Sequence, residues 1–553
     1  MAHGDSPRRG ASAHLKRYGV FYAIGVAAIV ALGVLPAVGG DDDDDVASGA
    51  TTTSTTEVEA PVDDGAFRPA SGDIVGGTGT TRDGRECTPD TPQVPDLSYS
   101  PPCLPVFEGD NGGATSKGVT AETIKIVIRS FPDSPNSLET QRRLQEAGFA
   151  TTEVTQQIRD QFNEYFNETY ELYGRRVEFV EYESRFGDAT AEAVGGGREG
   201  ACQDATYIAE ELGAFGVRAG GGAFAECAAE RGLVVFAGGP YFSESFFEKW
   251  SPYVYNTTMS CDRVSAHVAE YIVKRLHGKP AAHAGGDLAG KERTFGTYVP
   301  DNEEYVGCSD VTREHLREQG VDPGLRVTYA LDISKFVDQA NRAIVQFKAE
   351  GVTTIVTACD PISLGMLTNA AAEQDYYPEW MIIGTAATDS DNFGRQYNQD
   401  VVGGRMFGIS QLASTRLLLG PDSEAGRLHE RVVGGPIPPG TTGTLYEYMH
   451  VFNLLMAAGP DLTPANIEAG AARLPALGGP DYPAGRWYFG AGIDGTPDHT
   501  AVDDAREVYW DPNAEPGPEE PDRTKRGTFV ESNPGVRYDI GEWEEGDPKV
   551  ADV

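Results

Sequence analysis

Short apolar runs alternate with longer amphipathic runs between residues 118 and 286 of this chain. The apolar runs are rich in β-branched and aromatic residues, which is typical of strands buried on both faces of a parallel sheet. They occupy residues 124–128, 177–182, 214–217, 233–237 and 253–255. The amphipathic runs, at residues 152–173, 198–212 and 223–231, place apolar side chains on one stripe, as crossover helices do. The alternation predicts a parallel α/β lobe whose ligands bind at the carboxyl ends of its strands.

The same alternation starts again after Asn256. We expect further strands at residues 280–284, 326–331, 353–357 and 380–383. Helices are expected at residues 263–276, 303–319, 335–348 and 363–372. Because single cores stop growing beyond about 250–300 residues, two successive α/β lobes fit this pattern better than one large sheet.

Composition adds a constraint on the ligand. The 553 residues are enough for two lobes, and a hydrophobic content of 40% is ordinary for a globular protein. The formal net charge is −39, from 84 acidic and 45 basic residues. A chain this acidic lacks the basic surface that phosphate groups require, so we expect no nucleic-acid partner.

The N-terminal segment carries a candidate membrane span. Basic residues precede an uncharged stretch at residues 18–38, and residues 41–45 are all Asp. A length of about 20 residues suits a span, and the charge order places the following chain outside the cytoplasm. The stretch is longer than the ~7–15 residues of a secretory core, which favours a retained anchor over a cleaved signal. We therefore expect a cytoplasmic leader at residues 1–17 and an extracytoplasmic protein anchored to the plasma membrane, or secreted if the span is cleaved.

Two segments have the composition of unstructured chain. Residues 39–117 are rich in Thr, Asp, Gly, Pro and Ser, and we interpret them as a disordered or extended tether with a partly ordered end. The aspartate run within them is a solvated charge run rather than a metal site. Residues 513–553 form a Pro-, Gly- and Glu-rich tail that we expect to lie along the surface or fray.

Seven cysteines in an exported chain predict three disulfides and one thiol. Cys87 and Cys103 would close a loop in the tether region, and Cys202 with Cys227 would join two successive helices. The sequence leaves the pairing of the others open; these are Cys261, Cys308 and Cys359. No zinc-type spacing of Cys and His occurs, so no metal or other cofactor is expected.

Several segments together resemble a known family. KGVTAETIKIVIRS at residues 117–130 is similar to the opening strand of type I periplasmic solute-binding proteins of the branched-chain amino acid class. Further segments that match the order and spacing of that family lie at residues 214–239, 251–276, 351–385 and 443–460. The chain departs from the family in lacking a lipid-acceptor cysteine after the leader, in a long polar loop after the first strand, and in its C-terminal tail.

The resemblance implies the type I periplasmic binding fold, which is two doubly wound parallel-sheet lobes joined by three crossovers. Lobe 1 would comprise residues 118–258 and 404–485, and lobe 2 residues 259–403 and 486–512. Hinge closure would trap a small polar organic ligand, amino acid-like or a carboxylate, and an ABC permease would receive it. A ligand-sensing ectodomain that acts through a membrane partner is the alternative.

Candidate ligand residues in lobe 1 follow the predicted strands. Gly221 and Gly222 open a helix after the third strand, where free N–H groups suit a carboxylate, although a tight turn explains them as well. Arg129 and Arg218 end strands and would clamp an acidic ligand or pair with a protein carboxylate. The other candidates of this lobe are the strand-end residues Ser130 and Phe131, and Tyr241 and Phe242, which would stack on a ligand or pack between the lobes.

In lobe 2, Asp262 begins the crossover helix, Tyr305 follows the sixth strand and Asp360 follows the eighth. An acid and a phenol opposite the glycine turn would complement an α-ammonium group, while Asp262 also suits a helix cap. Gln411 is a weaker candidate on the return strand. The nine histidines are scattered and no G-x-S-x-G turn occurs, so we expect a binding protein and not an enzyme.

Overall fold

The computed structural model describes residues 74–552 except 134–150, 194–195, 219–220, 237–241, 385, 387, 412–422, 439–441, 479–484, 491–495 and 517–522. The predicted span at residues 18–38 and the candidate Tyr241 lie outside the described residues. Among the helices that are described, none combines the length and the apolar character needed to cross a membrane.

Lobe 1 is built on a five-stranded parallel sheet in the order β4-β3-β5-β6-β7. Its strands are β3 (Thr123–Ser130), β4 (Arg176–Glu183), β5 (Gly216–Arg218), β6 (Val234–Phe236) and β7 (Val254–Tyr255). Alternate residues of β3 point to opposite faces, so Ile126 packs in one core cluster and Val127 in another. The first face is covered by α3 (Thr152–Thr169) and α16 (Thr442–Ala457), and the second by α5 (Arg198–Glu210) and α6 (Gly222–Glu230). Smaller helices of this lobe are α4 (Ala189–Ala193), α7 (Glu244–Trp250), α15 (Glu424–Val432) and α17 (Pro464–Ala471).

Lobe 2 has a seven-stranded sheet in the order β14-β13-β12-β11-β10-β8-β9. Its parallel strands are β8 (Phe295–Pro300), β9 (Leu325–Tyr329), β10 (Thr354–Thr357), β11 (Glu379–Ile382) and β12 (Met406–Ser410). Two antiparallel strands extend one edge: β13 (Arg506–Asp511) and β14 (Thr528–Glu531). One face packs on α8 (Cys261–Tyr271) and α9 (Glu303–Glu318), and the other on α10 (Phe336–Ala349) and α11 (Pro361–Glu373). Short helices α12 (Asp391–Gly394) and α13 (Gln399–Val402) precede β12.

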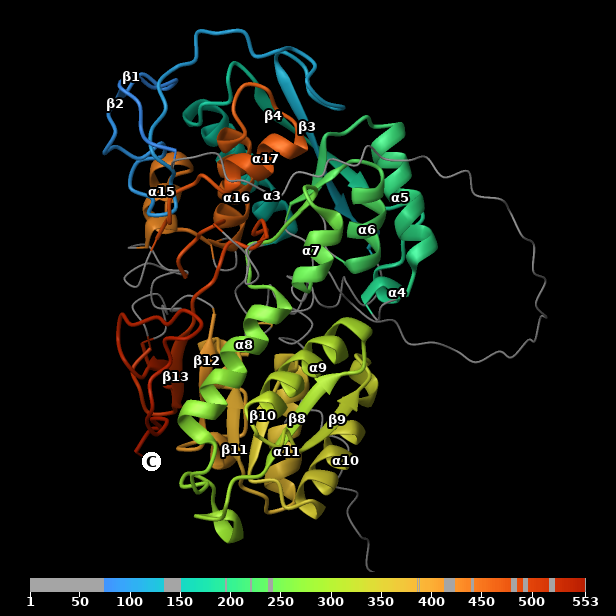
Figure 1. Ribbon diagram of the computed structural model, residues 1–553, viewed down its shortest axis with the longest axis vertical. Coiled ribbons are helices and arrows are strands. Elements are labelled where there is room, and N and C mark those ends of the chain that lie inside the picture. Colours follow the sequence, from blue (N-terminus) through green and yellow to red (C-terminus); the bar gives the residue numbers. More distant parts are fainter. Residues whose placement is uncertain are drawn as a thin grey trace, which may run out of the picture.

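Both lobes repeat one strand order, in which the second strand lies outside the first and the third, fourth and fifth follow on the other side. The chain passes between the lobes three times: between β7 and α8, after β12, and before β13. Figure 1 shows the lobes as two separate bodies, with lobe 2 below lobe 1. The predicted fold class, two doubly wound parallel lobes joined by three crossovers, is confirmed.

One predicted strand of lobe 2 is wrong. Residues 280–284 lie in a loop, and the strand that follows α8 is β8, Phe295–Pro300. The segment at 280–284 offers no β-branched side chains, whereas β8 places Phe295 and Val299 on one face and Tyr298 on the other. Bulky aromatic and β-branched side chains were therefore the better guide to the strand, which is buried on both faces.

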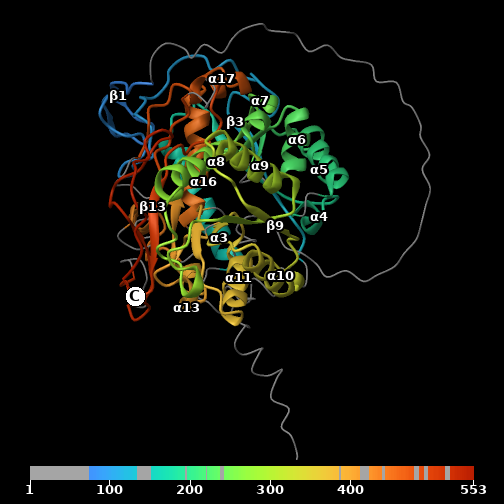
Figure 2. The same ribbon diagram turned by 60° about the horizontal axis from the view of Figure 1, so that its bottom comes forward.

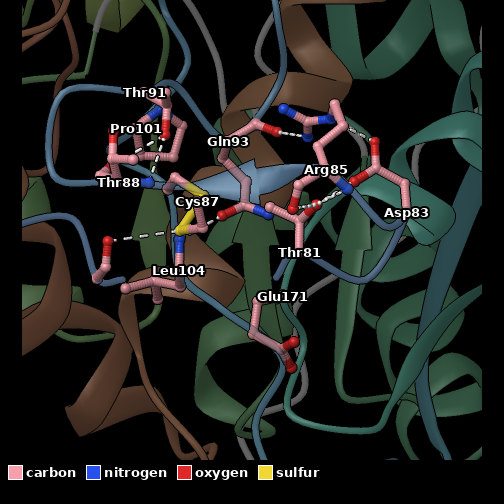
Figure 3. The surroundings of a disulfide bond; sticks show 12 residues. Thr81, Asp83, Arg85, Cys87, Thr88, Thr91, Gln93, Pro101, Leu104 and Glu171 are labelled. Carbon is pink, nitrogen blue, oxygen red and sulfur yellow. Dashed lines mark hydrogen bonds and ion pairs between the residues drawn. A yellow bond between two sulfur atoms is a disulfide. The ribbon is translucent and has the colours of Figure 1, made fainter. Parts of the chain in front are cut away.

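The end of the segment assigned to the tether is folded against lobe 1. Residues 79–87 form a small antiparallel pair, β1 (Gly79–Thr80) and β2 (Glu86–Cys87), next to the disulfide Cys87–Cys103 (Figure 3). Gln93 is fully buried; its side chain donates to the Thr169 carbonyl at 2.6 Å and accepts from the Leu104 N–H at 2.7 Å. The proline-rich composition of this segment predicts no regular structure. Its contacts could not be predicted from the segment alone, because their partners belong to lobe 1.

The C-terminal residues 523–552 lie along lobe 2 and the crossovers. After β14 the chain crosses α8, where the Trp543 side chain is only 2% exposed. The Trp543 indole N–H donates to His267 Nδ1 at 3.1 Å, and its ring stacks on Tyr538 with centroids 4.4 Å apart. The tail thus covers the outer side of the helix that opens lobe 2.

Three disulfides are present, as the cysteine count predicted. Cys87–Cys103 and Cys202–Cys227 are the pairs that the sequence indicated. The third, Cys261–Cys308, joins α8 to α9, and Cys359 is a buried thiol.

We predict that Trp543→Ala lowers the free energy of unfolding by about 3–5 kcal/mol, because it empties a buried aromatic site. Chemical unfolding followed by far-UV circular dichroism measures the change. Val536→Ala is the matched control: this side chain of the same segment is 42% exposed, and its truncation should cost less than about 0.5 kcal/mol. Equal stability of the two variants would show that the tail is not docked.

Candidate functional site

The carboxyl ends of the two parallel sheets face each other across the lobe boundary. Gly222 begins α6 directly after β5 of lobe 1, and Glu304 lies in the first turn of α9 directly after β8 of lobe 2. The Glu304 carboxylate lies against Gly222 so closely that a Cβ atom at this glycine would overlap it. Both views place α9 on the side of lobe 2 nearest α6 and α7 (Figures 1 and 2). Ligands of open α/β sheets bind at this edge, so the candidate site lies here.

The lobe 1 wall of the site begins with the glycine turn. Gly221 is the N-cap of α6 with φ +103°, a backbone conformation that favours glycine, and no side chain caps the helix. The first N–H groups of α6 and its positive dipole end thus point towards Glu304. Burial, followed by the charges of Glu303 and Glu226, raises the pKa of Glu304.

The two arginines proposed as clamps are paired with protein carboxylates. Arg129 is buried; it donates to Asp204 Oδ2 from Nη2 at 2.7 Å and to Glu192 Oε1 at 2.6 Å. Arg218 pairs with Glu447 and stacks over the Tyr448 ring at 5.2 Å. These contacts fit the salt-bridge interpretation of both residues. Each guanidinium group pairs with carboxylates of lobe 1, so it stabilises the packing within that lobe.

Three other lobe 1 candidates have different surroundings. Ser130 ends β3 and is exposed, with its hydroxyl 3.5 Å from the Tyr182 carbonyl. Phe131 is half-buried and lies under the Arg129 guanidinium at 4.5 Å. Phe242 is buried and stacks on Phe246 with centroids 4.1 Å apart, so it packs within lobe 1.

Two of the lobe 2 candidates organise helix ends. Asp360 is the N-cap of α11 and accepts from the N–H groups of Ile362 at 2.9 Å and Ser363 at 3.0 Å. It also accepts from the Tyr329 hydroxyl at 2.6 Å, which completes its hydrogen bonds inside lobe 2. Asp262 caps no residue of its own helix, whose N-cap is Ser260; it accepts from the Glu244 N–H at 2.8 Å, at the start of α7.

Tyr305 lies one residue after Glu304 and lines a small apolar cavity between α8, α9 and the sheet. The cavity has a volume of about 30 Å³, and its walls include Val264, Val268, Val299 and Leu316. Burial raises the pKa of Tyr305, with a smaller contribution from Glu304. A space of this size holds one or two water molecules rather than an organic ligand.

Gln411, the weaker candidate, links two crossovers, because its side-chain oxygen accepts a hydrogen bond from the Met259 N–H at 3.0 Å. Of the sequence-based candidates, Gly221 and Gly222 lie at the lobe boundary, whereas Tyr305 lines the cavity inside lobe 2. Glu304 was missed, because an acid in the first turn of a helix is ordinarily explained by the helix dipole. Within the described residues no group of three His, Cys, Asp or Glu side chains is arranged to hold a metal ion.

We predict that Asp360→Ala lowers the free energy of unfolding by about 1–3 kcal/mol, because two helix N–H groups and the buried Tyr329 hydroxyl lose their acceptor. Thermal unfolding followed by calorimetry measures the change. Asp287→Ala, an exposed carboxylate of the same lobe, is the control and should change stability by less than about 0.5 kcal/mol. An unchanged stability for Asp360→Ala would contradict the capping role and favour a direct ligand contact.

Known proteins share this architecture at low sequence identity. No protein-family model matches the chain, and no curated protein matches its sequence. A fatty acid ABC transporter substrate-binding protein from Thermomonospora curvata matches with a TM-score of 0.51 and 14% identity, over 77% of this chain and 95% of that one. A periplasmic binding protein from Burkholderia mallei matches with a TM-score of 0.50 and 11% identity, over 76% of this chain and 96% of that one.

The names of these two neighbours describe a substrate-binding protein and a periplasmic binding protein. Their alignment covers nearly all of each neighbour, so the residues of this chain left over are additions to a complete two-lobed body. The resemblance inferred from the sequence is thereby confirmed in the fold: this chain has the type I periplasmic binding fold of ABC transporter substrate-binding proteins.

Proposed function

We propose that this protein is an exported, membrane-tethered solute-binding protein that captures a small polar organic ligand between its lobes and delivers it to an ABC transporter. The observation that carries the proposal is the meeting of Glu304 from lobe 2 with the glycine-capped end of α6 from lobe 1. In a fold whose lobes move by hinge closure, a ligand held at this boundary favours the closed arrangement.

The charges at the boundary favour an amino acid-like ligand or another carboxylate. The N–H groups of α6 suit a carboxylate, and Glu304 on the opposite wall suits an ammonium group. The α6 N–H groups favour a negative group and Glu304 favours a positive group, and the two belong to different lobes. An α-amino acid, which carries both charges, would therefore bridge the lobes. Arg129 and Arg218 already have carboxylate partners, so the proposed carboxylate contact depends on backbone N–H groups.

The proposed delivery of the ligand to a transporter is supported by the fold and by the sequence. The fatty acid-binding neighbour is a transporter component whose ligand class also carries a carboxylate, which supports a carboxylate for this chain. The uncharged stretch at residues 18–38 would hold the protein at the outer face of the membrane, near a permease. A membrane tether keeps the local concentration of the binding protein high at its partner.

The proposal is tested by thermal shift of the full chain with L-leucine, 4-hydroxybenzoate and octanoate as probes. A ligand at about 100 times its dissociation constant stabilises the protein by about 2.7 kcal/mol. We expect the amino acid to raise the Tm most. If none of the three probes and no other proteinogenic amino acid raised the Tm, capture of an amino acid or carboxylate would be excluded.

We further predict that Glu304→Gln weakens binding of the stabilising amino acid at least about tenfold, because the buried ammonium group loses its charged partner. Glu303→Gln is the matched control, because this neighbouring carboxylate is as exposed as that of Glu304 but is not the one that lies against Gly222, so its loss should leave the affinity within about twofold. Isothermal titration calorimetry measures both. An equal loss of affinity in the two variants would mean that Glu304 acts only through the overall negative charge of the surface and not through direct contact with the ligand.

A further inference from the structure

A buried charged cluster joins the two lobes next to the first and third crossovers. Arg263, in the first turn of α8, is 5% exposed, and its guanidinium group contacts three carboxylates. Its Nη2 lies 2.7 Å from Asp498 Oδ2, its Nε lies 3.2 Å from Glu244 Oε1, and its Nη1 pairs with Asp503 Oδ1. We call these four residues, Arg263, Glu244, Asp498 and Asp503, the hinge cluster.

The members of the hinge cluster belong to parts of the chain that a hinge motion would move relative to one another. Glu244 opens α7 of lobe 1, Arg263 belongs to lobe 2, and the two aspartates belong to the third crossover. The first and third crossovers are joined there by backbone hydrogen bonds, from Asn256 N–H to the His499 carbonyl at 2.8 Å and from Ala501 N–H to the Asn256 carbonyl at 3.0 Å. A change in the angle between the lobes therefore changes the distances within the cluster.

The hinge cluster carries more negative charge than its one guanidinium can balance. Three carboxylates face one Arg, and Asp498 and Asp503 are only 3% and 8% exposed. Asp498 also accepts from the N–H and hydroxyl of Thr500 at 2.8 and 2.9 Å, and Asp503 forms an ion pair with Arg263. Buried carboxylates in such excess take up a proton, because protonation is less costly than an unbalanced buried charge.

The neighbouring charged groups do not restore the balance. Asp262, on the same helix, adds another carboxylate, with its Oδ2 on the Glu244 N–H. Among the cations nearby, Arg486 pairs with Asp539 at 2.7 Å and Arg537 pairs with Asp504 at 3.0 Å.

His267 touches the cluster through its Nε2, which is 2.8 Å from the Asp503 carbonyl. Since its Nδ1 accepts from Trp543, the Nε2 carries the ring proton. Burial lowers the pKa of His267 to about 4, so this ring adds no positive charge near neutral pH.

We propose that the hinge cluster is a proton-linked switch, in which one proton held by Asp498 and Asp503 stabilises the lobe arrangement described here and its loss drives the lobes towards another arrangement. Glu244, Asp498 and Asp503 repel one another once the proton leaves, and separation of Glu244 from the crossover relieves that repulsion.

The pH range follows from the two aspartates. Burial, followed by the charge of Asp498, raises the pKa of Asp503 to about 8, and burial raises the pKa of Asp498 to about 6. A carboxyl whose pKa is raised in one arrangement favours that arrangement most at low pH, and the preference is lost as the pH rises through the raised value. The preference for the present arrangement should therefore weaken as the pH rises through about 6 and be lost above about pH 8.

The experiment measures the distance between the lobes without any ligand, so it is independent of the proposed solute. Spin labels attached through non-cysteine chemistry at Glu210 of α5 and Gln346 of α10, both exposed, report the distance by pulsed electron paramagnetic resonance on the full chain. We expect the distance distribution to shift between pH 5.5 and pH 9.0. Asp503→Asn should hold the pH 5.5 distribution at both values, because an amide cannot lose the proton.

Two further variants make the result specific. Glu244→Gln removes one repelling charge and should move the midpoint of the shift to lower pH, which also provides a test if Asp503→Asn folds poorly. Asp310→Asn is the matched control and should behave as the unmodified protein. Asp310 lies on α9 and forms an exposed ion pair with Arg326 of β9. A distribution that is the same at both pH values in the unmodified protein, or a full shift that persists in Asp503→Asn, would overturn the proposal.

Discussion

Burial of parallel strands on both faces is the constraint on which the structure depends. A parallel sheet needs helices on each side, and each crossover helix returns the chain to the same edge, so all strand ends of one kind gather at one edge. β3 illustrates the result, with Ile126 and Val127 in separate cores. Two such sheets in one chain place two binding edges opposite each other, and the meeting of Gly222 with Glu304 lies where they face.

Buried guanidinium groups form a second level of organisation, and several of them pair with carboxylates, whereas Arg175 donates to backbone carbonyls. Arg293 lies between α8 and β8 and pairs with Glu379 of β11 at 2.8 Å, which ties two parts of lobe 2. Arg129 pairs with Asp204 within lobe 1. Breaking such a pair leaves an uncompensated buried charge, so these contacts fix which segments lie together. The hinge cluster differs because three carboxylates share its one guanidinium and because it joins both lobes.

The additions at the two ends of the chain have a common effect. The disulfide-closed segment at residues 74–117 packs on lobe 1, and the tail after β14 packs on lobe 2. Arg537 of the tail donates to the carbonyls of Gln411 and Asp504, which belong to the second and third crossovers. The tail therefore restrains the crossovers directly, and the angle between the lobes depends on more of this chain than the two sheets alone.

The sequence by itself determined the fold class, because strand and helix periodicities are local and survive in a single chain. It also indicated the glycine turn at Gly221 and Gly222 and two of the three disulfides, since these need only spacing along the chain. It misplaced the strand at residues 280–284 and left Arg129 and Arg218 open between ligand and salt bridge. Only the tertiary structure decided those cases, and only it showed Glu304 and the hinge cluster, because the partners of a buried charge come from segments far apart in sequence.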